Sequence, residues 1–258
     1  MKKLIVAMSL ALVACVQQPT ESRTQSNPEG GASDTDMQGR ARAFTDLAAA
    51  YFQRAQYKIA LDELRKAILA DPRYGPAYNI YGLVYMELAE DKLAEEYFRR
   101  ALELDRTDSE AHNNYGWFLC TRGRYDEGLA QFGAALQNPL YASPEQAMAN
   151  AGLCAEKKGD LALAETHLTR ALKLQPDNAR ALISLARLNF RKGKYTETQR
   201  LLTRHSEITP ATAESLWLSL RLERKLGDRA QEAAYGLQLR KRFPDSDEAR
   251  VLRAGQYE

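Results

Sequence analysis

The chain of 258 residues contains little of what marks several classes of protein. Three cysteines are too few for a disulfide-dense scaffold or for a four-cysteine zinc site. Nine prolines and 15 glycines exclude collagen-like and low-complexity sequence. Neither sign of charge dominates, because 36 Lys and Arg face 34 Asp and Glu, and the net charge of +2 indicates no nucleic-acid partner. With 45% hydrophobic and 27% charged residues, the chain is neither disordered nor an integral membrane protein.

The N-terminus carries the pattern of an export signal. A short positive segment with Lys2 and Lys3 precedes an apolar run over residues 4–13, which is too short to cross a bilayer. The next residues, Leu12-Val13-Ala14-Cys15, resemble the bacterial lipobox, in which a cysteine is acylated and becomes the new N-terminus. We therefore expect residues 1–14 to be a signal peptide and Cys15 to be lipidated. A plain secretory signal that happens to contain a cysteine is the alternative.

Residues 15–40 are predicted to be a flexible tether. Their composition is rich in Gln, Ser, Thr, Pro and Gly, and they cannot bury enough apolar surface to become ordered. Such a tether holds the following domain roughly 25–30 Å from the lipid. In Gram-negative lipoproteins, an Asp directly after the lipidated cysteine resembles the signal for retention in the inner membrane. In this sequence that residue is Val16. The resemblance implies a lipid anchor on the periplasmic face of the outer membrane.

The body of the chain is a repeat. Residues 41–246 equal six units of 34 residues with two left over. Small residues at positions 8, 20 and 27 of most units allow two antiparallel helices to pack closely, and large residues mostly at 4, 7, 11 and 24 fill the space between them. Position 20, for example, reads Ala60, Ala94, Gly128, Ala164, Thr198 and Glu232, so the pattern weakens in the last two units.

Two kinds of residue predict where the helices of each unit end. Position 15 of the last four units is glycine, where the first helix must end and a left-handed residue costs glycine little. These residues are Gly123, Gly159, Gly193 and Gly227. Proline at position 32 stops the second helix in most units, whereas the second unit has Arg106. Because no single unit can bury its own apolar face, the six must stack.

This pattern resembles the tetratricopeptide repeat. The resemblance implies an all-α fold, a right-handed superhelical solenoid of six helix-turn-helix repeats. The predicted units are 41–74, 75–108, 109–144, 145–178, 179–212 and 213–246. The two additional residues fall near 138–144, which predicts a longer loop between the third and fourth units. Residues 247–258 form a C-terminal tail to which no function is assigned.

In tetratricopeptide solenoids, positions 2, 5, 9 and 12 of each first helix face a concave groove. By this resemblance the candidate groove residues are Phe52, Asn79, Leu83, Met86, Asn113, Trp117, Cys120 and Leu153. Leu83, Met86 and Trp117 are apolar where packing within a repeat does not need them. They either pack against neighbouring helices or form a groove for an apolar peptide or amphipathic helix. We favour the groove, with Asn79 and Asn113 bonding to the backbone of the peptide.

The last two units are basic. Residues 179–246 contain 14 Lys or Arg against 7 Asp or Glu. The candidate basic patch consists of Arg180, Arg187, Arg191, Arg221, Arg224 and Lys225. A solvated basic face is the ordinary interpretation, and contact with an acidic partner or with anionic lipid is the functional one. The lysine of the two-carboxylate clamp is missing from the first three units, so recognition of chaperone tails is not expected.

Cys120 and Cys154 remain as a pair if Cys15 is lipidated. Both lie on the first helices of adjacent units, so a disulfide is geometrically feasible in the oxidising cell envelope, and two buried thiols are the alternative. The three histidines are isolated, and no metalloprotease, hydrolase or phosphate-binding motif is present. We therefore expect no enzyme activity, cofactor, metal, small-molecule substrate or nucleic-acid partner.

One stretch narrows the resemblance further. The segment 111–120, AHNNYGWFLC, followed by Asn138-Pro139-Leu140-Tyr141 and by NAGLC at 150–154, resembles the PilW/PilF type IV pilus biogenesis and stability proteins. Those proteins are outer-membrane lipoproteins with six tetratricopeptide repeats. The lipobox, the repeat count, the insertion between units three and four and the two cysteines also match.

The resemblance implies the role of a pilotin. Such a protein binds subunits of the outer-membrane secretin, PilQ, and promotes their localisation and their assembly into the pore through which pili emerge. We expect the first four units to make this contact. The alternative is a general envelope scaffold lipoprotein that organises outer-membrane or cell-wall assembly enzymes.

Overall fold

The computed structural model describes residues 33–256, and all regular structure in this range is helical. The predicted signal peptide and Cys15 lie outside the described residues, so lipidation stays a prediction. None of the helices in this range combines the length and the apolar character that a membrane span requires. The helices are α1 (Asp34–Gln53), α2 (Tyr57–Ala70), α3 (Gly75–Glu87), α4 (Asp91–Leu104), α5 (Ser109–Thr121), α6 (Tyr125–Ala135), α7 (Pro144–Lys158), α8 (Leu161–Leu174), α9 (Ala179–Arg191), α10 (Tyr195–Ile208), α11 (Ala213–Leu226), α12 (Arg229–Arg242) and α13 (Asp247–Arg253).

The first twelve helices form six antiparallel hairpins, and the predicted all-α solenoid is confirmed. The small residues lie where the two helices of a hairpin meet. Ala60, Ala94 and Ala164 are fully buried, and a Cβ on Gly82 would lie 2.6 Å from the ring of Phe98. The large side chain of one helix therefore fills the space that the small residue of its partner leaves open.

Helix α1 begins at Asp34, within the segment predicted to be tether, which corrects the boundary at residue 40. Ser33 caps the helix, because its hydroxyl accepts a hydrogen bond of 3.2 Å from the backbone N–H of Asp36. Asp34 and Asp36 place negative charge at the positive end of the helix dipole. These capping signals start the helix before the apolar repeat pattern begins.

The predicted C-terminal tail also contains a helix. Helix α13 packs against α11 and α12. Its Ala249 and Leu252 are buried in an apolar cluster with Leu216, Leu220 and Leu239. A terminal repeat has no following neighbour to cover its apolar side, and α13 covers that of the sixth hairpin.

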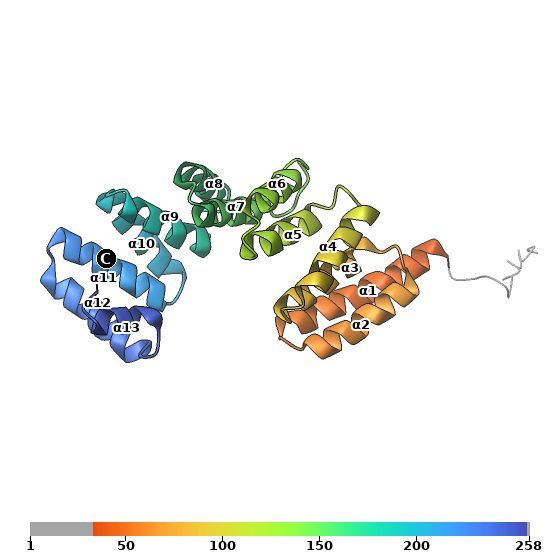
Figure 1. Ribbon diagram of the computed structural model, residues 1–258, viewed down its shortest axis with the longest axis horizontal. Coiled ribbons are helices and arrows are strands. Elements are labelled where there is room, and N and C mark those ends of the chain that lie inside the picture. Colours follow the sequence, from red (N-terminus) through yellow and green to blue (C-terminus); the bar gives the residue numbers. More distant parts are fainter. Residues whose placement is uncertain (1–32, 257–258) are drawn as a thin grey trace, which may run out of the picture.

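The stack is curved. Each odd-numbered helix from α1 to α9 contacts the next odd-numbered one, whereas in the described chain no two even-numbered helices bring their backbones close together. The stack therefore bends toward the odd-numbered helices. Figure 1 shows the resulting arch, with α5 and α7 on its inner side and α6 and α8 on its outer side. We call the surface formed by α1, α3, α5, α7, α9 and α11 the groove face.

Candidate functional site

A row of hydrogen-bonded amides runs beneath the groove face. The Nδ2 of Asn114 donates to Oδ1 of Asn79 (3.2 Å), and the Nδ2 of Asn150 donates to Oδ1 of Asn113 (3.0 Å). Arg180 extends the row by donating to Oδ1 of Asn150 at 3.3 Å. The row therefore links α3, α5, α7 and α9.

These contacts correct the role expected for two candidate residues. Asn79 and Asn113 are only 3% and 1% exposed, and each bonds to an asparagine of a neighbouring helix. Buried amides are stable only when their donors and acceptors are paired, and here the neighbouring repeat supplies the partner. The two side chains hold repeats together and are not open to the backbone of a peptide.

The apolar candidates lie nearer the surface. Phe52, Leu83, Met86, Trp117 and Leu153 are all half-buried, and we call them the apolar stripe. Phe52 packs against the core of the first two hairpins, and Leu83 and Met86 pack against the cluster around Phe98. Packing against neighbouring helices thus accounts for one side of these residues, and the rest of their surface is open to solvent.

A disulfide lies directly beneath the stripe. Cys120 on α5 and Cys154 on α7 are bonded, with their Cα atoms 5.7 Å apart. Of the two alternatives for this pair, the structure has the bridge. Both cysteines are buried, so Cys120 does not face the groove, and Trp117 packs against their cluster. The bridge ties the third hairpin to the fourth across the long loop.

Two cations lie over the indole of Trp117. The Nζ of Lys157 lies 5.7 Å from the ring centre, and the guanidinium carbon of Arg180 lies 5.6 Å from a ring centre of the same indole. Both distances are within the range of cation–π contact. Neither cation forms an ion pair with a carboxylate of residues 33–256. The middle of the groove face therefore combines an aromatic surface with two positive charges.

The predicted basic patch is not uniform, because some of its arginines are paired. Arg187 makes a two-pronged ion pair with Glu156, at 2.8 and 3.0 Å, and a further one with Glu214. Burial and these hydrogen bonds act in opposite directions on its guanidinium, and the bonds prevail, so the pKa of Arg187 is raised. Arg187 connects α7, α9 and α11 and does not act as an open cation.

The remaining members of the patch differ from one another. Arg191 lies 3.9 Å from Glu156, and Arg224 pairs with Glu232 at 2.8 Å. The guanidinium of Arg221 lies 4.8 Å from the ring centre of Phe190, and burial lowers its pKa. Lys225 is exposed on α11. The expected basic character therefore comes from individual side chains and not from a continuous surface.

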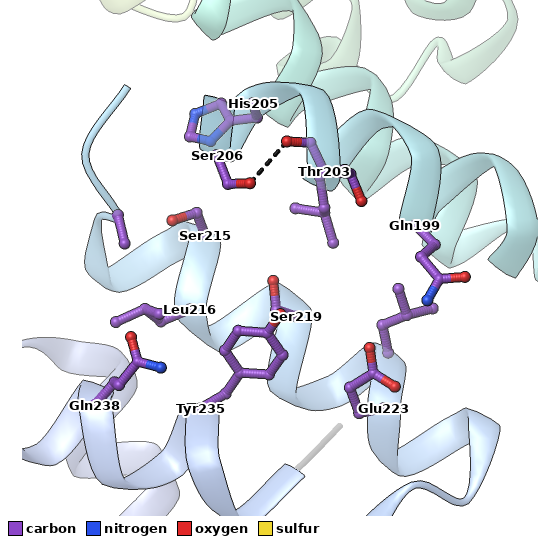
Figure 2. A pocket seen from close by; sticks show the side chains of 13 residues that line it. Gln199, Thr203, His205, Ser206, Ser215, Leu216, Ser219, Glu223, Tyr235 and Gln238 are labelled. Atoms are coloured by element: carbon purple, nitrogen blue, oxygen red, sulfur yellow. Dashed lines mark hydrogen bonds between the residues drawn. The ribbon is translucent and has the colours of Figure 1, made fainter. Parts of the chain in front are cut away.

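A pocket that the sequence did not predict lies between α10, α11 and α12, with a cavity volume of about 220 Å³. Figure 2 shows hydroxyl and amide side chains around it, with His205 and Glu223 on its wall. Burial raises the pKa of Glu223 and lowers that of His205. The one available signal was His205, which stands where the first four repeats have alanine. In the described chain no three potential ligands gather to hold a metal.

Comparison with known proteins relates this architecture to a family. Profiles described as "Tetratricopeptide repeat" match residues 75–108, 97–130, 116–168 and 155–221. The type IV pilus assembly protein PilF of Pseudomonas aeruginosa is 28% identical over 251 residues, which are 97% of each chain. A solved structure of Pseudomonas aeruginosa PilF has a TM-score of 0.79 and 29% identity, covering 85% of this chain and 99% of that one.

A second solved structure strengthens the relationship. The crystal structure of PilW, a widely conserved type IV pilus biogenesis factor, is 32% identical with a TM-score of 0.75. The match covers 82% of this chain and 97% of PilW. The similarity thus extends over nearly the whole of both relatives and over most of the solenoid. The chain belongs to the PilF and PilW family of type IV pilus biogenesis proteins, which are built of tetratricopeptide repeats.

Proposed function

We propose that the protein is an outer-membrane lipoprotein that binds subunits of the secretin PilQ and promotes their localisation and multimerisation. Membership of a family of type IV pilus biogenesis factors supports a role in pilus biogenesis. The observation that carries the binding role is the apolar stripe on the groove face. Its five residues lie on four consecutive odd-numbered helices and remain half-buried, although four of them pack against an apolar cluster.

The mechanism is physical and involves no reaction. A lipid on Cys15 anchors the protein to the membrane. The segment that follows sets the distance of the solenoid from the membrane, and the groove face binds the secretin. A bound secretin segment would cover the open surface of Leu83, Met86 and Trp117. Buried apolar surface contributes about 25 cal/mol per Å², and large aromatic side chains carry much of the binding energy of an interface.

Co-purification from detergent-solubilised outer membrane tests this function. The wild-type protein should recover the secretin, and the double variant Leu83→Ala/Trp117→Ala should recover little of it while its helical circular dichroism stays unchanged. A matched control is Leu69→Ala/Leu140→Ala, since these leucines are 83% and 87% exposed and lie outside the groove face. Secretin recovery that is equal for the wild type and the groove variant would contradict the proposal.

A further inference from the structure

Charge is divided between the two halves of the solenoid. Residues 34–143, which form the first three hairpins and the long loop, contain 13 Lys or Arg and 17 Asp or Glu, a net charge of −4. Residues 144–256 contain 20 Lys or Arg and 14 Asp or Glu, a net charge of +6. The small net charge of the whole chain therefore conceals a molecule with a negative and a positive end.

The groove face follows the same division. Helices α3 and α5 each carry one acidic residue and no Lys or Arg, and α9 carries three arginines and no acidic residue. Helix α11 carries three basic and two acidic residues. Most of the apolar stripe lies on the helices before α7. Helix α1 carries Arg40 and Arg42, which its three aspartates outnumber, and the other Lys and Arg residues of the groove-face helices lie from α7 onward. The two kinds of surface meet at Trp117.

Two positive groups gather at this junction. Lys157 and Arg180 both lie over the indole of Trp117, and no carboxylate of the described chain pairs with either. The hydrogen bond from Arg180 to Asn150 holds the guanidinium in place while leaving its other N–H groups available. A fixed arginine beside a lysine binds a carboxylate more strongly than two mobile surface cations do.

We propose that the groove binds a bipartite protein segment, with apolar side chains on α3 and α5 and an acidic side chain between Lys157 and Arg180. This inference rests on the proposed function and deepens it, because it states the chemistry of the bound segment. Complementary charge at one end and apolar surface at the other allow only one direction of binding. A segment with basic residues after its apolar ones is disfavoured at the same place.

Charge reversal in the groove tests the inference. The affinity of Lys157→Glu/Arg180→Glu for the purified periplasmic part of the secretin should be about tenfold weaker than that of the wild type, because a bound carboxylate is then repelled. The neutral variant Lys157→Gln/Arg180→Gln should lie between them. A matched control, Arg170→Glu/Lys173→Glu, makes the same change of charge on α8 and should bind as the wild type does.

Salt provides a second readout on the wild-type protein. Raising NaCl from about 50 mM to about 500 mM should weaken the wild type markedly and the neutral variant little, since the carboxylate contact is partly exposed and is screened. A zero-length carbodiimide crosslinker should join Lys157 to an aspartate or glutamate of the bound partner, and peptide mass spectrometry should locate that bond. Absence of any crosslink at Lys157 in a fully formed complex would overturn the inference.

The stripe variant Leu83→Ala/Trp117→Ala separates this inference from the proposed function. If the stripe variant loses binding and Lys157→Glu/Arg180→Glu retains it, the carboxylate contact is overturned and the function stands. If both variants bind as the wild type does, both proposals fail. Wild-type binding to phosphatidylglycerol vesicles that the charge reversal abolishes, with secretin binding unaffected, would assign the cations to a lipid surface and overturn the inference.

Discussion

Ala55 and Ala89 stand where the later hairpins have glycine. They have φ values of 55° and 58°, while Gly123, Gly159, Gly193 and Gly227 have φ between 73° and 92° at the same position of their repeats. This left-handed conformation ends the first helix of each hairpin. A side chain with a Cβ is strained there, so the first two repeats hold two residues in an unfavourable conformation.

Replacing Ala89 with glycine should stabilise the protein. Relief of the strain exceeds the extra entropy that glycine loses on folding, and we expect the free energy of unfolding to rise by roughly 0.5 to 1 kcal/mol. Urea denaturation measures the change. The reverse substitution, Gly123→Ala, should destabilise by about 1 kcal/mol, because no atom lies near its Cβ position and the backbone strain acts alone. Equal urea midpoints for the wild type, Ala89→Gly and Gly123→Ala would show that the residue type at this position of the repeat does not affect stability.

At the same scale, the helix and repeat position of each candidate residue were predictable, but its burial and its side-chain partners were not. Repeat numbering places Asn113 and Trp117 on the same face of a helix. It does not reveal that Asn113 bonds to Asn150, 37 residues further on, or that Arg187 is paired with Glu156. Those pairs depend on how one hairpin rotates against the next, and this rotation follows from side-chain packing between repeats. The burial of Asn79 and Asn113 was missed for that reason.

At the scale of elements, the disulfide links the third hairpin to the fourth, where α5 and α6 both contact α7. Cys120 and Cys154 are 34 residues apart in sequence, so the bond closes a long loop in the unfolded chain. In the chain-entropy account, a loop of this length is worth about 4 kcal/mol. The bridge also holds the two helices on which Trp117 and Lys157 lie.

Removing the disulfide should therefore lower the stability of the central hairpins. We expect Cys120→Ala/Cys154→Ala to unfold at a lower urea concentration, with a free energy of unfolding reduced by about 4 kcal/mol. Hydrogen exchange should rise most in α5 and α7. A reducing agent should destabilise the wild type and leave the double variant unchanged. A wild type that is insensitive to reduction, with both cysteines shown to be reduced, would contradict this.

Element boundaries were predicted less well than the elements themselves. The early start of α1 depends on the cap formed by Ser33, and such a cap can form wherever a serine precedes a helix-compatible stretch. The apolar repeat pattern, which begins later, contains no information about it. Helix α13 was missed because seven residues are too few for a clear apolar period, and its formation depends on the exposed end of the sixth hairpin.

At the scale of the whole molecule, a period of 34 residues was sufficient to predict the solenoid, because each hairpin can bury its apolar face only against its neighbours. The pocket between α10, α11 and α12 and the cations over Trp117 were not predictable, since they require the positions of residues from three helices. The division of charge between the halves can be counted in the sequence, although only its basic part, in residues 179–246, was predicted.

Secretin assembly, the proposed function, also belongs to the scale of the whole molecule. A protein that assembles secretin subunits must determine whether the pore forms, and a general scaffold lipoprotein has no such requirement. In the proposed function, the apolar stripe is the part of the molecule that binds the secretin subunits. Loss of the whole protein and loss of the stripe should therefore have the same consequence for the secretin.

The most direct measurement is an immunoblot for heat-stable secretin multimers in membranes of a deletion strain that expresses no protein, the wild type, or Leu83→Ala/Trp117→Ala. The account predicts multimers with the wild type, and only secretin monomers both without the protein and with the variant at equal expression. Abundant heat-stable multimers in the deletion strain, together with normal twitching, would contradict it.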